Sequence, residues 1–212
     1  RDLGSRPSNL IASRELYPPS PDRARLVAAG PLITVPDGYP IVPFGGNWAV
    51  TVTSVGEARR LAEDLLDNGG ADLLKIVIET GSGFGQQIPV LSRAQASMLV
   101  RVAHGRGTVV SAHITSVEDI HRALDSGADD LAHMAANREV PDQEIERVVA
   151  LGVLWVPTLE LWACNNQTAM AVANLGRFVQ AGGQVAMGTD FEGYTCDWDR
   201  GMPMTEIRLM EQ

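Results

Sequence analysis

The chain has 212 residues, 45% of them hydrophobic and 20% charged, a globular composition long enough for one large domain or two small ones. Its formal net charge of −9 argues against a nucleic-acid partner, because phosphate binding needs a basic surface. No apolar run reaches the roughly 18 residues that a membrane-spanning helix needs. The only cysteines, Cys164 and Cys196, are too few for a disulfide framework and favour a reducing, cytoplasmic compartment.

The first fifty residues are rich in turn formers, in the runs RPSN, YPPSP, VPDGYP and PFGGN. Between them, Ala24 to Thr34 is predicted to form a short buried strand followed by a loop. A helix is predicted from Ser54 to the Gly69–Gly70 pair, because an N-cap serine precedes apolar residues at helical spacing. The strand ADLLKIVIE follows, and it is apolar apart from Lys75.

This helix-then-strand unit repeats to the end of the chain. Predicted helices cover 92–107, 116–127, 141–152 and 168–183, and predicted strands cover 108–114, 128–134, 153–159 and 184–190, with a last helix beginning near Pro203. Strands that alternate with helices of ten to fifteen residues predict a parallel sheet. Two architectures fit this pattern, an open doubly wound sheet and a (β/α)8 TIM-type barrel.

Polar residues at the ends of successive strands favour the barrel. In this interpretation, Lys75, His113, His133 and Asp190 lie at the C-terminal ends of successive strands, and barrel enzymes build their active sites on that rim. Residues from distant strands of an open sheet would not meet at one point. The run GSGFGQ opens no helix directly and is only a weak match to a phosphate-binding loop.

Taken singly, each of these four residues is more often structural than functional, but their shared position indicates one site. Two histidines and a carboxylate suit a divalent metal such as Zn²⁺, which would supply hydroxide at neutral pH. Lys75 can join such a site only if it is no longer a cation. Reaction with CO₂ would turn its ammonium into a carbamate, an anion with two oxygens.

Several phrases of the sequence resemble the amidohydrolase superfamily, in the branch of imidazolonepropionase and the metal-dependent Xaa-Pro and Xaa-Arg/Lys dipeptidases. They are RDLG, AAGPLIT, GADLLKI, VVSAHITSVEDIHRALDSGADDLAHM, VPTL and VAMGTDF, in the family's order. The resemblance implies a hydrolase of amide, cyclic amide or dipeptide C–N bonds with a small-molecule substrate. It also implies that residues 1–212 are one partial barrel domain, and a homo-oligomer is an expected assembly.

The resemblance assigns a role to each of the four residues. Lys75, on the fourth barrel strand, would be the carboxylated, metal-bridging residue of a site that holds one or two ions. His113 and His133, on the fifth and sixth strands, would be metal ligands. Asp190, on the eighth strand, would be both a metal ligand and the general base that passes a proton to the leaving amine.

The sequence departs from the family pattern because it contains no His-x-His pair, which the family carries on the first strand. The flanking β-sandwich is also missing, so the chain is interpreted as truncated at both ends. Two alternatives therefore stay open: a Schiff-base lyase that uses Lys75, and a catalytically incomplete fragment. The loop residues Arg200, Tyr194, Trp198, Trp162 and Asn166 are more often structural and are not predicted as site residues.

Overall fold

The computed structural model describes residues 1–45, 49–163, 166–190 and 204–212, so Cys164, Tyr194, Cys196, Trp198 and Arg200 lie outside the described residues. The strands are β1 (Leu32–Thr34), β2 (Ala49–Thr51), β3 (Leu74–Val77), β4 (Val110–His113), β5 (Asp130–Ala132) and β6 (Leu154–Val156). The helices are α1 (Pro7–Leu16), α2 (Ile41–Phe44), α3 (Val55–Asp67), α4 (Arg93–Gly105), α5 (Val117–Ser126), α6 (Asp142–Ala150), α7 (Leu159–Ala163), α8 (Thr168–Gln180) and α9 (Met204–Met210), with a 3₁₀ turn at Ser82–Phe84.

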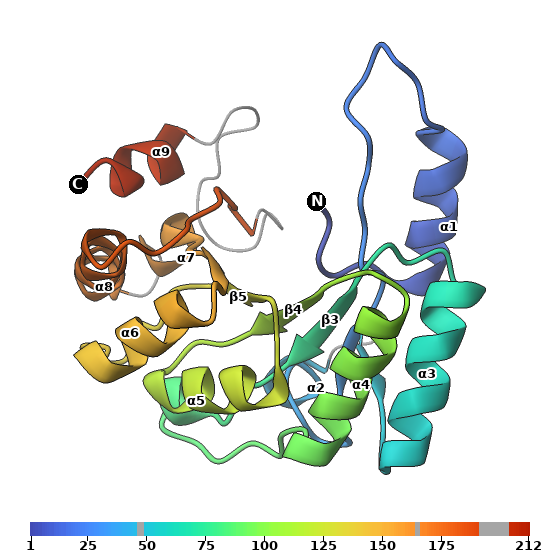
Figure 1. Cartoon of the computed structure of the whole chain (residues 1–212), viewed down its shortest axis with the longest axis horizontal. Helices are drawn as coiled ribbons and strands as arrows, with labels where there is room; N and C mark the ends of the chain where they lie inside the picture. Colours follow the sequence, from blue (N-terminus) through green and yellow to red (C-terminus); the bar gives the residue numbers. More distant parts are fainter. Residues whose placement is uncertain (46–48, 164–165, 191–203) are drawn as a thin grey trace.

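The described strands form one parallel sheet in the order β2-β1-β3-β4-β5-β6. From β3 to β6, neighbours in the sheet are also neighbours in the chain, and each consecutive pair is joined by a helix. Helices α3, α4, α5 and α6 lie along one side of the sheet (Figure 1). This arrangement confirms the predicted parallel β/α fold.

The predicted helices form where local signals start and stop them. Ser54 caps α3 by accepting a hydrogen bond from the Glu57 backbone N–H, and Ser92 and Gln95 form a capping box on α4. Helix α5 ends at Gly127, whose φ of 88° suits glycine. The apolar faces of these helices pack against strand residues such as Ile76, which is fully buried.

Three predictions about the elements were wrong. The segment Ala24–Thr34 was expected to be a strand followed by a loop, but it makes a single bridge at Ala28 and then forms β1. Helix α1 and strand β2 were not predicted within the turn-rich first fifty residues. The expected strand 184–190 is reduced to an isolated bridge between Trp155 and Val185.

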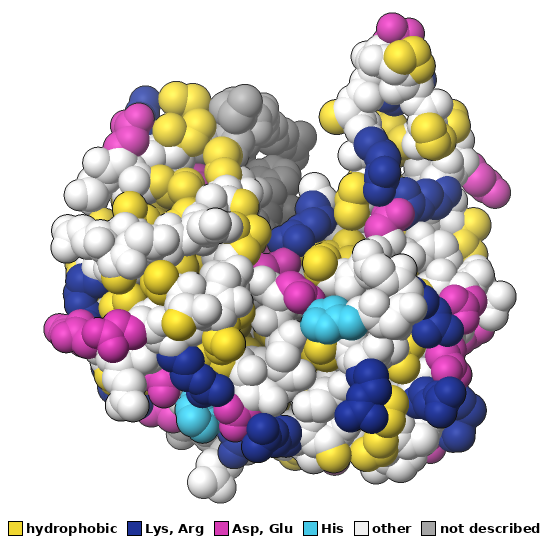
Figure 2. All heavy atoms as spheres, viewed as in Figure 1, with side chains coloured by type: hydrophobic (Ala, Val, Ile, Leu, Met, Phe, Trp, Pro, Cys, Tyr) yellow, Lys and Arg dark blue, Asp and Glu magenta, His cyan; other side chains and the backbone are white. Residues whose placement is uncertain are grey.

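The surface mixes both signs of charge. Lys and Arg alternate with Asp and Glu over the face shown in Figure 2. Helix α1 and the segment after it project from the body of the molecule, and Ile11, Leu16 and Tyr17 on this projection are exposed (Figure 1). Among the described residues, the structure contains no helix with the length and apolar character needed to cross a bilayer.

Candidate metal and active site

The register of the sheet determines which face carries Lys75. Leu74 and Ile76 of β3 belong to the hydrophobic core, so Lys75, between them, points to the opposite face. Lys75 pairs in register with Ser111 of β4, and Ser111 pairs with Asp130 of β5. This layer of polar side chains is therefore a direct result of alternation along adjacent strands.

Lys75 is buried, with 3% of its surface exposed, and its Nζ lies 3.3 Å from Ser111 Oγ. Burial lowers the pKa of Lys75 to about 8, although the carboxylates of Asp130 and Asp190 oppose this effect. Arg1 lowers the pKa further, and its guanidinium also pairs with Asp130 at 2.9 Å. The fold thus brings the pKa of this amine closer to physiological pH than that of an exposed lysine.

His113 ends β4 one layer above Ser111, toward the carboxyl ends of the strands. Its ring stacks on Tyr39, with a centroid distance of 4.5 Å and an interplanar angle of 22°. The edge of the His133 ring contacts it at a centroid distance of 4.7 Å. His113 Nε2 is buried without a hydrogen-bond partner and lies 3.6 Å from Glu79 Oε2. Three neighbours therefore fix the plane of this imidazole.

His133 follows β5 directly and has a positive φ of 72°, which is uncommon outside glycine. Two contacts hold it in place. Its Nδ1 lies 2.8 Å from Thr158 Oγ1, and its carbonyl accepts a hydrogen bond from Trp155 Nε1. Burial, and then the charges of His113 and Lys75, lower the pKa of His133 well below its usual value. The imidazole is therefore neutral at physiological pH, the form that can coordinate a metal.

Asp190 lies at the end of the described segment 166–190, with a φ of 51°. Its Oδ2 is 4.0 Å from His133 Nδ1, and 36% of its side chain is exposed. Removal of water by the surrounding protein raises the pKa of Asp190, while Lys75 and His113 act to lower it. The four predicted residues thus lie within contact or electrostatic range of one another.

The donor set has the chemistry of a divalent-metal site: two buried imidazoles, a carboxylate and an amine with a lowered pKa. The fit is partial, because no three His, Cys, Asp or Glu side chains of the described residues are gathered closely enough to hold an ion. A carbamate on Lys75 would add an anionic donor to this set. Metal binding therefore remains a prediction.

Three neighbours of the site were missed by the sequence reasoning. Glu79 is four residues after Lys75, an even spacing that keeps both on the same face of an extended chain, so the alternation of the strand could have indicated it. Tyr39 comes from the segment between β1 and β2, and Thr158 follows β6. For these two, only the spatial arrangement reveals the contacts with His113 and His133.

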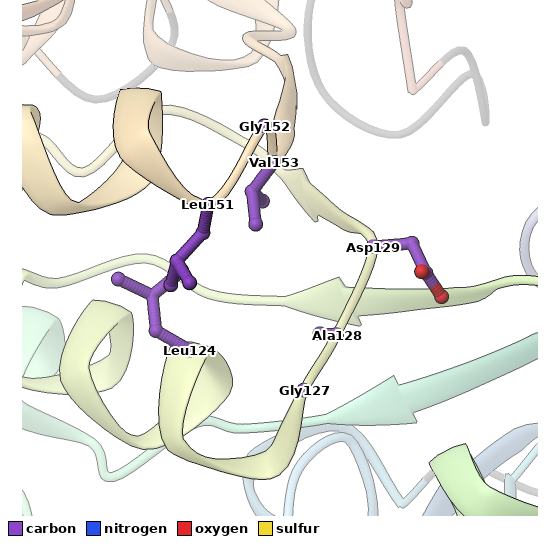
Figure 3. Close-up of a pocket in the computed structure, with 7 residues that line it drawn as sticks. All are labelled: Leu124, Gly127, Ala128, Asp129, Leu151, Gly152 and Val153. Carbon is purple, nitrogen blue, oxygen red and sulfur yellow. The ribbon is translucent and has the colours of Figure 1, made fainter.

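The remaining histidines lie away from the site. His104 Nε2 binds Asp129 Oδ2 at 3.0 Å, and His121 is more than half exposed between Asp125 and Glu144. A cavity of about 270 Å³ lies before β5 and β6, at the opposite end of the strands from the site (Figure 3). The apolar side chains of Leu124, Leu151 and Val153 cluster together, while Asp129 points away from them. The described lining therefore brings no set of polar side chains together for catalysis.

Comparison of the sequence with protein-family models and with curated proteins gives no match. Similar solved structures include an amidohydrolase, with 22% identity, a TM-score of 0.76, and coverage of 100% of this chain and 58% of that chain. A Xaa-Pro dipeptidase with bound methionine gives 18% identity and a TM-score of 0.76, over 99% of this chain and 57% of that one. A putative prolidase from Bifidobacterium longum gives 24% identity and a TM-score of 0.67, over 89% of this chain and 50% of that one.

The chain therefore spans a little over half the length of the amidohydrolase and dipeptidase that it matches. This coverage agrees with the predicted incomplete barrel, since the described residues supply six parallel strands in one sheet. The chain has the fold of the amidohydrolases and Xaa-Pro dipeptidases.

Proposed function

We propose that this chain is a large part of the barrel of a metal-dependent hydrolase that cleaves a C–N bond in a small amide, cyclic amide or dipeptide. The observation that carries the proposal is the proximity of Lys75, His113, His133 and Asp190: Lys75 and His113 lie on neighbouring strands, and His133 contacts His113 and lies 4.0 Å from Asp190, in a chain with the amidohydrolase fold. The names of the similar structures support the reaction class, since they include an amidohydrolase and a Xaa-Pro dipeptidase.

Lys75, His113, His133 and Asp190 are the residues that would hold the metal, most simply Zn²⁺. When bound, the ion would supply Lewis-acid activation of water at neutral pH. Addition of CO₂ to Lys75 forms an N–C bond and releases a proton, which requires the neutral amine. The lowered pKa of Lys75 supports this role, because a larger neutral fraction is present at physiological pH than for an exposed lysine.

Asp190 is the proposed proton carrier. A carboxylate at the carboxyl ends of the strands can accept a proton from the attacking water and return it to the leaving nitrogen. The raised pKa of Asp190 supports this role, since a proton carrier works best when its pKa approaches the working pH. His133 lies beside it, and its lowered pKa makes it too weak a base to compete for that proton at physiological pH.

Metal content tests the proposal directly. Protein purified without chelator is measured by plasma mass spectrometry as wild type, as His113→Ala and as His121→Ala. We expect about one or two equivalents of a divalent metal in the wild type, a loss in His113→Ala, and no change in His121→Ala, because His121 is exposed on α5. A folded wild type without metal, even after incubation with Zn²⁺ and bicarbonate, would refute the proposal for this chain.

A Schiff-base lyase is the second candidate, and the lowered pKa of Lys75 is the observation that favours it. This reaction needs the free amine rather than a carbamate, so the two functions make opposite predictions for one reagent. Borohydride in the presence of carbonyl substrates would trap a covalent adduct on Lys75 in a lyase. Metal-dependent release of an amine from a dipeptide, without such trapping, would instead identify the hydrolase.

A further inference from the structure

Glu79 is a fully buried carboxylate at the carboxyl end of the strand that carries Lys75. Its Oε1 accepts a hydrogen bond from the Gly81 backbone N–H at 2.6 Å, and its Oε2 accepts one from the Thr115 hydroxyl. These donors come from both sides of the side chain, from the turn after β3 and from the segment between β4 and α5. They hold the carboxylate in one orientation without neutralising it.

The same Oε2 faces His113. The distance from Oε2 to His113 Nε2 is 3.6 Å, somewhat longer than a hydrogen bond, and Nε2 has no other partner although it is buried. A buried N–H without an acceptor is costly, so the ring is expected to carry its proton on Nε2, where the Glu79 carboxylate can accept a hydrogen bond from it. The Tyr39 stack and the His133 edge restrict rotation of the ring away from Glu79.

We propose that Glu79 is a positioning residue for His113, whose carboxylate keeps the proton on Nε2 and leaves Nδ1 as the nitrogen available to a metal. This inference rests on the proposed metal-binding role of His113. A neutral imidazole has one protonated and one free nitrogen, and the partner of the first decides which nitrogen can be a ligand. Carboxylates paired with metal-binding histidines commonly act in this way, and their loss lowers metal affinity by about 10- to 100-fold.

Asp119 provides a matched control in the same buried network. It is fully buried, and its carboxylate accepts hydrogen bonds from Thr80, Thr115 and Ser116 rather than from His113. Asp119→Asn therefore disturbs the same loops as Glu79→Gln without removing the group that faces the imidazole. A purely structural role for Glu79 would give both variants the same effect.

The first measurement is the tautomer of His113 in metal-free protein, from long-range ¹H–¹⁵N correlation spectra of protein with ¹⁵N-labelled histidine. The chain has only 4 histidines, so single-histidine variants assign the signals. We expect the Nε2–H form in the wild type and in Asp119→Asn, and loss of this preference in Glu79→Gln. Glu79→Asp, which keeps the charge but shortens its reach, should behave like Glu79→Gln and serves if the latter does not fold.

The second measurement is Zn²⁺ affinity by competition with a chelating dye. We expect about a 10- to 100-fold loss in Glu79→Gln and little change in Asp119→Asn. An unchanged tautomer with unchanged affinity, or equal losses in both variants, would overturn the inference. A wild type that binds no zinc would instead refute the proposed function, and the tautomer spectra would still decide the role of Glu79.

Discussion

Glu206 of α9 is a fully buried carboxylate that is hydrogen-bonded to α7, a helix more than forty residues earlier in the chain. Its Oε2 accepts a hydrogen bond from the Glu160 backbone N–H at 2.7 Å, at the start of α7, while Oε1 is buried without a partner. Burial raises the pKa of Glu206 to about 7, and the nearby Glu160 carboxylate adds to the rise, against the backbone hydrogen bonds from Glu160 and Leu159. The protonated form therefore suits the folded state better than the anion.

This pKa predicts how stability depends on pH. The folded state binds the Glu206 proton more tightly than the unfolded state, whose pKa is 4.5. The stabilising contribution is complete below pH 4.5 and is lost as the pH rises through about 7. The rise corresponds to at most about 3 kcal/mol of unfolding free energy, at about 1.4 kcal/mol per pH unit.

Glu206→Gln removes this titration while keeping an oxygen that can accept the Glu160 N–H. We expect the variant to match the wild type within about 1 kcal/mol at pH 5 and to exceed its stability by up to about 3 kcal/mol at pH 8. Urea unfolding of both proteins at the two pH values measures the difference, and taking it between proteins cancels the other titrating groups. The same stability difference at pH 5 and pH 8 would refute the reasoning.

Three further substitutions test the site and the packing. Lys75→Met should abolish metal binding yet raise the stability of chelator-treated protein at pH 7 by up to about 3 kcal/mol, because a pKa lowered from 10.5 to about 8 means that the buried cation destabilises the fold. Urea unfolding measures this gain, and a less stable variant would contradict it. Gly183→Ala should destabilise by about 1 to 3 kcal/mol, because its Cβ would lie 2.3 Å from the Phe178 ring. Gly176→Ala, in the middle of α8 with open space around it, should instead be stabilising by up to about 1 kcal/mol in thermal unfolding.

Much of the fold could be predicted from the sequence, because its signals are local. Ser54 and Ser92 cap their helices within one turn, and Gly127 ends α5 where a left-handed residue is needed. The alternation of residues along β3 likewise places Lys75 opposite the apolar core. These features depend only on residues a few positions apart, so the helix-then-strand rhythm and the candidate site residues are visible without coordinates.

The failures concern features that depend on distant partners. A strand exists only where a neighbour pairs with it, and 184–190 makes just the bridge of Val185 to Trp155. Conversely, β2 forms in a turn-rich region because β1 lies beside it.

The surroundings of the site have the same long-range origin. The sequence by itself determined the parallel β/α architecture and indicated four polar candidates, although Lys75 lies inside β3 and Asp190 lies beyond the bridge at Val185 rather than on a described strand. Only the tertiary structure decided that Tyr39 stacks on His113, that Thr158 holds His133, and that Glu79 faces an unpartnered ring nitrogen. Hydrogen bonds and ring contacts act over a few ångströms in space, and residues 25 or more positions apart reach that range only after the sheet and its loops have packed.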